Sequence, residues 1–155
     1  MMVAEANLIA APIVHKTIIR VDRNLVFEAL ATAPGFDRWF TRGTYLDEHT
    51  GGSLVFKWED WGADRISSRA TGRVVTYQRS LRFVFDWERR TETRVALEFS
   101  DTPDGTLVKV SEFGYPDEPS GWENCLDCAT GWGEALTLAK FYLEHGITYS
   151  TPPVR

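Results

Sequence analysis

The sequence predicts an α+β fold in which an antiparallel sheet of about six to seven strands is covered by one long C-terminal helix. Apolar residues alternate with a period of two over much of residues 44–115, which is typical of half-buried strands. Short turns rich in Gly, Pro and Asp separate these segments and favour an antiparallel meander. The only long segment with helical periodicity is 125–146, so a single long helix is available to cover the sheet.

The first elements are a strand and one or two short helices. Residues 15–21, HKTIIRV, are rich in β-branched side chains and predict a strand. Asp22 offers an N-cap, and the apolar residues of 23–32 recur at helical spacing. A proline–glycine pair ends this helix, and the segment FDRWF at 36–40 predicts a second, shorter helical turn.

Six more strands are expected before the long helix. Residues 44–59 read as two strands joined at Gly51 and Gly52, for which we expect positive φ angles. Residues 65–78 predict a longer, more polar strand with a β-bulge at Gly72. The remaining strands are predicted at 80–88, 93–101 and 106–115.

The long helix opens with the pair Cys125 and Cys128, which allows two interpretations. At 100° per residue, both cysteines fall on one apolar stripe, where they would pack as small apolar groups. The alternative is a redox C-x-x-C motif, which normally follows a strand in a βαβ unit, and no such unit precedes this one. We therefore favour packing, as part of a stripe that continues through Trp132, Leu136, Ala139 and Leu143.

Composition argues against several classes of function. The net charge is −5 and the basic residues are scattered, which disfavours binding to nucleic acid or to an anionic membrane. The three histidines lack metal-ligand spacing, and the chain has neither a G-x-S-x-G nor a P-loop motif. We therefore expect no catalytic residue, no metal and no cofactor. Two cysteines do not make a disulfide framework, which favours a reducing, cytoplasmic location.

The chain is the size of one ordinary domain. We expect residues 1–12 to form a flexible N-terminal tail, because they are only mildly apolar and lack the basic start of a signal peptide. Residues 13–147 form the predicted domain. Residues 148–155 are expected to be a C-terminal tail, because Pro152 and Pro153 stop any helix.

Three blocks of sequence resemble a known family. They are residues 18–40, the Gly51–Gly52 pair before an aromatic strand, and GWGEALTLAKFYLEHG at 131–146. Together they resemble START-like (SRPBCC) domains of the activator of heat shock protein 90 ATPase homologue type, over about residues 14–146. The resemblance implies a helix-grip fold, with a curved antiparallel sheet around the C-terminal helix and an apolar cavity between them. Ala139 stands where the family usually has Leu, which either enlarges the cavity or is compensated by a neighbour.

An aromatic excess supports the cavity that the resemblance implies. Aromatic residues make up 13% of the chain, more than a minimal core needs. The alternative is that these rings pack closely and leave no space. Strand parity predicts Phe56, Trp58, Phe83, Phe85 and Trp87 as lining residues. The long helix adds Trp132 and Leu136, and the short second helix adds Trp39.

Glu112 completes the set of expected ligand-binding residues. It shares the parity of Val108 and Val110, so it should point inward. A buried carboxylate needs a partner or takes up a proton, which makes Glu112 a candidate ligand anchor or acid–base group. The alternative is that the strand ends before Glu112 and the side chain reaches solvent.

Three functions are compatible with these features. The first is binding of a small apolar, lipid-like or aromatic ligand in the cavity. The second is a cochaperone-like interaction with a chaperone ATPase, which the family name suggests. The third is a cyclase or hydrolase reaction that uses a pocket carboxylate such as Glu112. An exposed Phe141 on the long helix would also fit a homodimer contact, although single exposed apolar residues are common.

Overall fold

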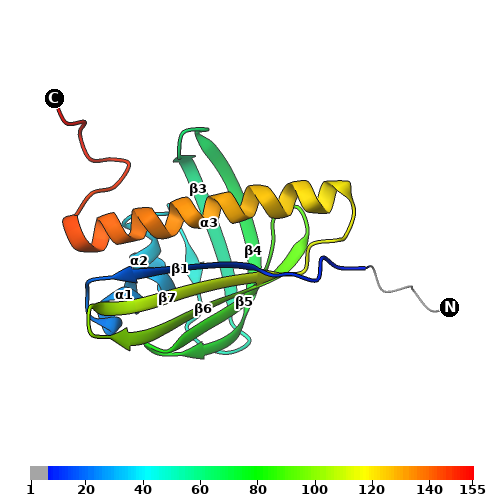
Figure 1. The fold of residues 1–155 in the computed structure, drawn as a ribbon, viewed down its shortest axis with the longest axis horizontal. Helices are drawn as coiled ribbons and strands as arrows, with labels where there is room; N and C mark the ends of the chain where they lie inside the picture. Colours follow the sequence, from blue (N-terminus) through cyan, green and yellow to red (C-terminus); the bar gives the residue numbers. More distant parts are fainter. Residues whose placement is uncertain (1–6) are drawn as a thin grey trace.

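The computed structural model describes residues 7–155 and shows a curved seven-stranded sheet that holds one long helix (Figure 1). Every strand pair is antiparallel, in the order β1-β7-β6-β5-β4-β3-β2. The predicted fold class is confirmed, including the two short helices after the first strand. The strands are β1 Ile13–Ile19, β2 Tyr45–Leu46, β3 Ser53–Trp61, β4 Ile66–Gln78, β5 Arg82–Glu88, β6 Glu92–Thr102 and β7 Gly105–Phe113, and the helices are α1 Arg23–Ala31, α2 Ala33–Asp37 and α3 Pro119–His145.

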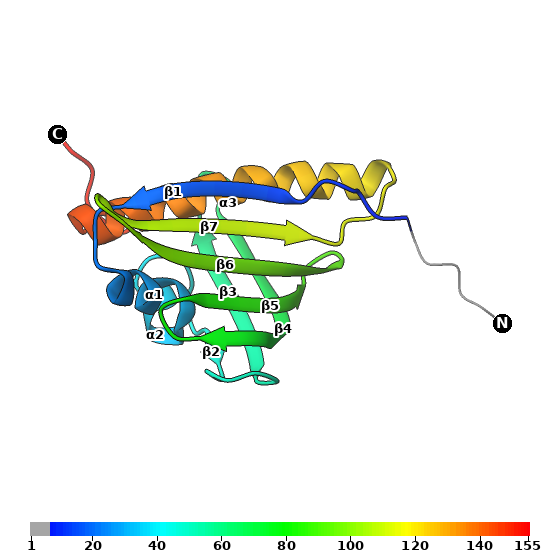
Figure 2. The same ribbon diagram turned by 60° about the horizontal axis from the view of Figure 1, so that its bottom comes forward.

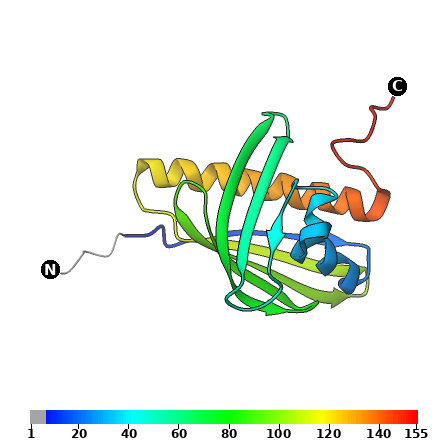
Figure 3. The same cartoon turned by 180° about the vertical axis from the view of Figure 1, so that it is seen from behind.

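The sheet curves around α3 because its strands change direction across its width. Strands β1, β7 and β6 run roughly along the helix, whereas β3 and β4 cross it steeply (Figures 2 and 3). The short helices α1 and α2 lie toward the end of the molecule where α3 terminates (Figure 3). The inner face of the sheet and the buried face of α3 therefore enclose one hydrophobic core.

Local signals explain the short helices. The Asp22 side chain accepts a hydrogen bond from the Asn24 backbone N–H at 2.9 Å, as the predicted N-cap requires. Thr32 ends α1 and starts α2. Its hydroxyl donates to the Glu28 carbonyl and accepts from the Gly35 N–H at 3.0 Å. This single threonine therefore caps the end of one helix and the start of the next.

The predicted strand parity is confirmed along the inner face of the sheet. In β3, Leu54 and Phe56 are both 1% exposed, and Phe83 and Phe85 in β5 have no exposed surface. Glu112 in β7 pairs with Val95 of β6 and is also 1% exposed. The alternative in which Glu112 reaches solvent is therefore wrong.

Two predictions about glycines are wrong. The register is regular through Gly72, which pairs with Trp87, and the shift in β4 falls between Val74 and Thr76. Gly72 instead allows a close approach, because a Cβ there would lie 2.0 Å from the Asp86 carbonyl oxygen. Of the turn pair, only Gly51 has a positive φ, at 83°.

A second irregularity, in β3, reorients the end of that strand. The four residues from Trp58 to Trp61 oppose the three residues of β4 from Ser68 to Ile66, so β3 carries one extra residue. Within this stretch Asp60 has a positive φ of 51°. The extra residue reverses the alternation, because strict parity would place Trp58 and Trp61 on opposite faces. Both tryptophans consequently face the same cavity.

The edge strand β1 is covered by the end of α3. Lys140 Nζ donates to the Ile18 carbonyl at 2.6 Å, and the Arg20 backbone N–H donates to Glu144. These contacts satisfy edge groups that would otherwise be open to another strand. Gly146 then terminates the helix with a left-handed φ of 69°.

The expected N-terminal tail falls partly outside the described residues, which exclude 1–6. Leu8 forms an isolated β-bridge with Pro116, and Ile9 is 3% exposed and packs in the core. Across residues 7–155, no helix has the length and apolar character needed to cross a membrane.

Candidate functional site

A cavity of about 120 Å³ lies between α3 and the strands β3, β4 and β5. Its strand side is formed by Trp58, Trp61, Ile66 and Trp87, and Phe40 closes one end from the segment after α2. Its helix side runs along α3 from Asp127 to Ala135 and includes Trp132. Four indole rings and one phenyl ring therefore surround the space.

The aromatic walls are held by ring-to-ring packing. Phe40 contacts Trp58 and Trp61 edge to face, with ring centroids 5.5 Å and 5.4 Å apart. Trp87 lies 5.9 Å from Trp58 and 5.8 Å from Trp132. Such pairs are stabilised beyond their buried area, so the rings hold one another in place around the cavity.

Arg89 lies at the mouth of the cavity over two of these rings. Its guanidinium carbon is 5.5 Å from the Trp58 ring and 5.6 Å from the Trp87 ring, within cation–π distance. Its Nη1 donates a long contact of 3.7 Å to Cys128 Sγ. The aromatic wall therefore accepts a positive charge on its open side.

Three carboxylates also line the cavity, at Asp64, Asp127 and Glu134. Asp127 is 3.8 Å from Arg90 Nη1 in an exposed ion pair. Glu134 accepts a hydrogen bond from the hydroxyl of Tyr149, whose ring packs against Trp61 at 5.6 Å. Burial, followed by this bond to Glu134, raises the pKa of Tyr149.

Trp61 contributes an unused donor. Its Nε1 is buried and has no hydrogen-bond partner among residues 7–155. A buried donor without an acceptor costs about 1–3 kcal/mol.

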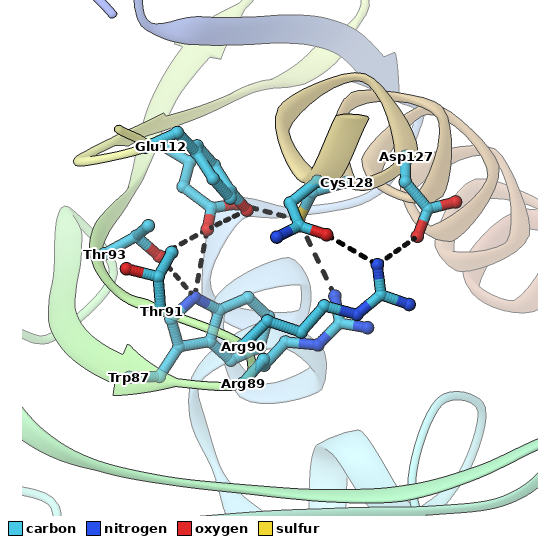
Figure 4. A pocket seen from close by; sticks show the side chains of 10 residues that line it. Trp87, Arg89, Arg90, Thr91, Thr93, Glu112, Asp127 and Cys128 are labelled. Atoms are coloured by element: carbon cyan, nitrogen blue, oxygen red, sulfur yellow. Dashed lines mark hydrogen bonds and ion pairs between the residues drawn. The ribbon is translucent and has the colours of Figure 1, made fainter. Parts of the chain in front are cut away.

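Glu112 lies directly behind the cavity wall, in a cluster of polar side chains (Figure 4). Both carboxylate oxygens accept hydrogen bonds. The donors to Oε2 come from the sheet side, and the donors to Oε1 come from α3. Oε2 accepts from Trp87 Nε1 at 3.1 Å, the Tyr115 hydroxyl at 2.9 Å and the Thr93 hydroxyl, and Oε1 accepts from Trp132 Nε1 at 2.8 Å and Cys128 Sγ at 3.0 Å.

This arrangement gives Glu112 a positioning function. Two of its five donors are the indole N–H groups of Trp87 and Trp132, two cavity-lining rings that pack against each other. The carboxylate therefore fixes both rings from behind. Charge-assisted hydrogen bonds of this kind are about twice as strong as neutral ones. A direct role of Glu112 as a ligand anchor or acid–base group stays a prediction.

The cysteines pack as side chains of the buried stripe. Cys125 and Cys128 are free and buried, and Cys128 donates its S–H to Glu112. Burial, together with the nearby Glu112 carboxylate, raises the pKa of the Cys128 thiol to about 12 and also raises that of Cys125. Thiol redox chemistry needs the thiolate, which this environment disfavours.

We expect the Cys128 thiol to resist alkylation in the folded protein. At pH 8, a pKa of about 12 leaves roughly a thousandfold less thiolate than the ordinary thiol pKa of about 9. Iodoacetamide labelling followed by mass spectrometry should show modification of Cys128 only after denaturation. Rapid labelling of native protein at the rate of a free thiol would contradict the packing assignment.

The structure places the predicted lining residues in three settings. Trp58, Trp87 and Trp132 line the cavity, and Glu112 lies behind them. Trp39 donates its Nε1 to the Ala29 carbonyl and stacks under Phe40 at 4.9 Å. The residues that lie in the close-packed core, each at most 1% exposed, are Phe56, Phe83, Phe85 and Leu136.

Ala139 lies beyond the part of α3 that forms the cavity. It is fully buried, whereas the helix wall of the cavity ends one turn earlier at Ala135. The periodicity of strands and helices did not predict Phe40, Trp61 and Arg89 as lining residues. It did not predict the three carboxylates at the mouth either. For Trp61, the sequence did contain an indication. Trp58 and Trp61 are three positions apart, so they can share one face of a strand only if the strand contains an extra residue.

The geometry defines a helix-grip protein of the START-like class, with a curved sheet, a long C-terminal helix and a preformed cavity between them. The family model described as "Activator of Hsp90 ATPase homolog 1-like protein" matches residues 20–144. The chain therefore belongs to this family, and the resemblance seen in the sequence is confirmed. No curated protein matches the chain in sequence.

Solved structures share the fold at low sequence identity. The protein SSP2350 from Staphylococcus saprophyticus has a TM-score of 0.72 at 18% identity, covering 92% of this chain and 98% of that chain. The Aha1 dimer from Colwellia psychrerythraea has a TM-score of 0.72 at 16% identity, covering 88% and 98%. DynU16, a putative protein in the dynemicin biosynthetic locus, has a TM-score of 0.72 at 18% identity, covering 87% of this chain and 48% of that chain.

Proposed function

We propose that this protein binds a small molecule with a flat apolar body in the cavity between α3 and strands β3 to β5. The observation that carries the proposal is the cavity of about 120 Å³ lined by four tryptophans and Phe40. Ligand sites are typically preformed, mostly apolar and equipped with a few polar groups. Here those polar groups are the guanidinium of Arg89 and the carboxylates at the mouth.

The size of the cavity favours one aromatic ring inside it. An apolar cavity of about 150 Å³ in another protein holds benzene, so a single ring is the right scale here. Larger ligands would extend through the mouth beside Arg89. Because the rings are already packed against one another, binding costs little conformational entropy in the side chains of the site.

The test is binding of 2-phenylethanol, a neutral aromatic ring that carries one hydroxyl group. A ligand of nine heavy atoms is expected to bind with a Kd of about 0.1–5 mM. At tenfold excess over Kd it should stabilise the fold by about 1.4 kcal/mol, which corresponds to a few degrees in Tm. Tryptophan fluorescence should change with the same Kd, because four indoles line the site.

Failure would be clear from these two readouts. If neither Tm nor tryptophan fluorescence responds to 2-phenylethanol up to its solubility limit, the cavity does not bind such ligands. A fluorescence change that does not saturate with ligand concentration, and that is the same for folded and denatured protein, would also count against the proposal.

A cyclase or hydrolase reaction at Glu112 has less support. Both of its oxygens accept hydrogen bonds from protein side chains, so a substrate would have to displace some of five donors. Pairing of two chains through Phe141, which is 47% exposed, and contact with a chaperone ATPase stay predictions. Sedimentation analysis and a pull-down of the purified ATPase test them respectively.

A further inference from the structure

We propose that the cavity selects ligands whose apolar body carries a positive charge, such as a protonated amine or a quaternary ammonium group. This inference rests on the proposed function and specifies the class of ligand. It is carried by the aromatic walls, by the charges at the mouth and by the position of Arg89.

The first argument is the electrostatics of the walls. The face of an indole ring is negative, and tryptophan is the best aromatic partner for a cation. The cavity presents four indoles from β3, β5 and α3. Arg89 already uses two of them, with centroid distances of 5.5 Å to Trp58 and 5.6 Å to Trp87. The protein's own side chain therefore marks a position where a cation is stabilised.

The second argument is the balance of charge at the mouth. Among the described residues that line the cavity, three are acidic, at Asp64, Asp127 and Glu134, and one is basic, at Arg89. Asp127 shares its charge with Arg90. Within residues 7–155, neither Asp64 nor Glu134 forms an ion pair, so two carboxylates remain without a cation. A ligand cation would meet this charge, whereas a ligand anion would be repelled by it.

The third argument is that Arg89 is replaceable. It is exposed, it forms no ion pair among the described residues, and its hydrogen bond to Cys128 Sγ is long at 3.7 Å. An ammonium group placed over the rings of Trp58 and Trp87 would take over its cation–π contacts. The displaced guanidinium can move into water at little cost, because it is already largely hydrated. Arg89 thus competes with the ligand for the same ring faces.

The experiment compares three probes of similar shape and different charge at pH 7, where the amine is protonated. They are 2-phenylethylamine, 2-phenylethanol and 3-phenylpropionate, with Kd measured by calorimetry. The amine is expected to bind at least about fivefold more tightly than the alcohol, and the carboxylate most weakly. Raising the salt concentration should weaken amine binding and leave alcohol binding unchanged.

Substitutions of the charged residues at the mouth show whether each of them strengthens or weakens amine binding. Asp64→Asn and Glu134→Gln should each weaken amine binding about two- to fivefold more than they change alcohol binding. Arg89→Met removes the competing cation and keeps the alkyl stem, so it should tighten amine binding about two- to fivefold. Asp104→Asn is the matched control, because it makes the same charge change in the exposed β6–β7 turn.

The outcomes separate this inference from the proposed function. If the alcohol binds as tightly as the amine, the charge selectivity is wrong and the cavity proposal stands. If the carboxylate binds most tightly and loses that affinity in Arg89→Met, the site is an anion site and the inference is overturned. If none of the three probes binds, both proposals fail.

Discussion

Replacing Glu112 with alanine is expected to destabilise the protein by about 3–5 kcal/mol. The side chain is 1% exposed and accepts hydrogen bonds from five side-chain donors, three on the sheet side and two on α3. Removing the carboxylate leaves buried N–H, O–H and S–H groups without an acceptor. Each such group costs about 1–3 kcal/mol, less where water can enter.

Urea unfolding followed by circular dichroism would measure this loss. Thr93→Val is the matched control, because it removes one of the five donors and leaves the carboxylate in place, and should cost about 1 kcal/mol. Glu112→Gln should fall between the two, because its amide keeps one acceptor oxygen and turns an NH₂ group toward donors. A change below about 1 kcal/mol for Glu112→Ala would show that the cluster does not hold the wall.

Replacing Gly131 with leucine is expected to weaken ligand binding by at least about tenfold without unfolding the protein. Gly131 lies in α3 on the cavity wall, and a Cβ built there meets no atom within 4 Å. A leucine side chain on a helix leans toward the N-terminal turn, which here places it across the cavity. Removing a helical glycine should also stabilise the helix, by about 0.5–1 kcal/mol.

Gly133→Leu provides a closely matched comparison. Gly133 is in the same helix and also has open space at its Cβ, but it is not among the residues that line the cavity. It should gain the same helical stability and keep wild-type affinity for 2-phenylethanol. Calorimetry on both variants tests this directly. Equal loss of binding in both, or no loss in Gly131→Leu, would contradict the position assigned to the site.

Part of the candidate site could be read from periodicity alone. Regular alternation in β5 placed Trp87 on the inner face, and the helical stripe placed Cys128 and Trp132 on the buried side of α3. The parity of β7 likewise turned Glu112 inward. These residues sit in uninterrupted elements, where the period of the backbone decides which way a side chain points.

The rest of the site is formed by residues at a bulge, after the end of a strand or in a turn, where regular alternation does not predict the direction of a side chain. The extra residue in β3 brings Trp61 to the face of Trp58, and no alternation rule predicts it. Arg89 follows the end of β5, where side-chain direction is set by the loop. The acidic residues come from a turn and from the exposed side of α3, so they meet at one mouth only because the sheet curves around the helix.

The sequence by itself determined most of the elements, the antiparallel meander of successive strands and which faces are buried, because these follow from local period and short connections. The pairing of β1 with β7 joins segments far apart in the chain and was decided by the tertiary structure. Which buried aromatic residues enclose space was decided by the tertiary structure. Phe56, Phe83 and Phe85 share the parity of Trp58 and Trp87, yet they pack in the core while the tryptophans border a cavity. The difference arises from the distance between the curved sheet and α3, which depends on strand twist, bulges and the Glu112 hydrogen bonds. These are long-range properties, and no single segment of the chain carries them.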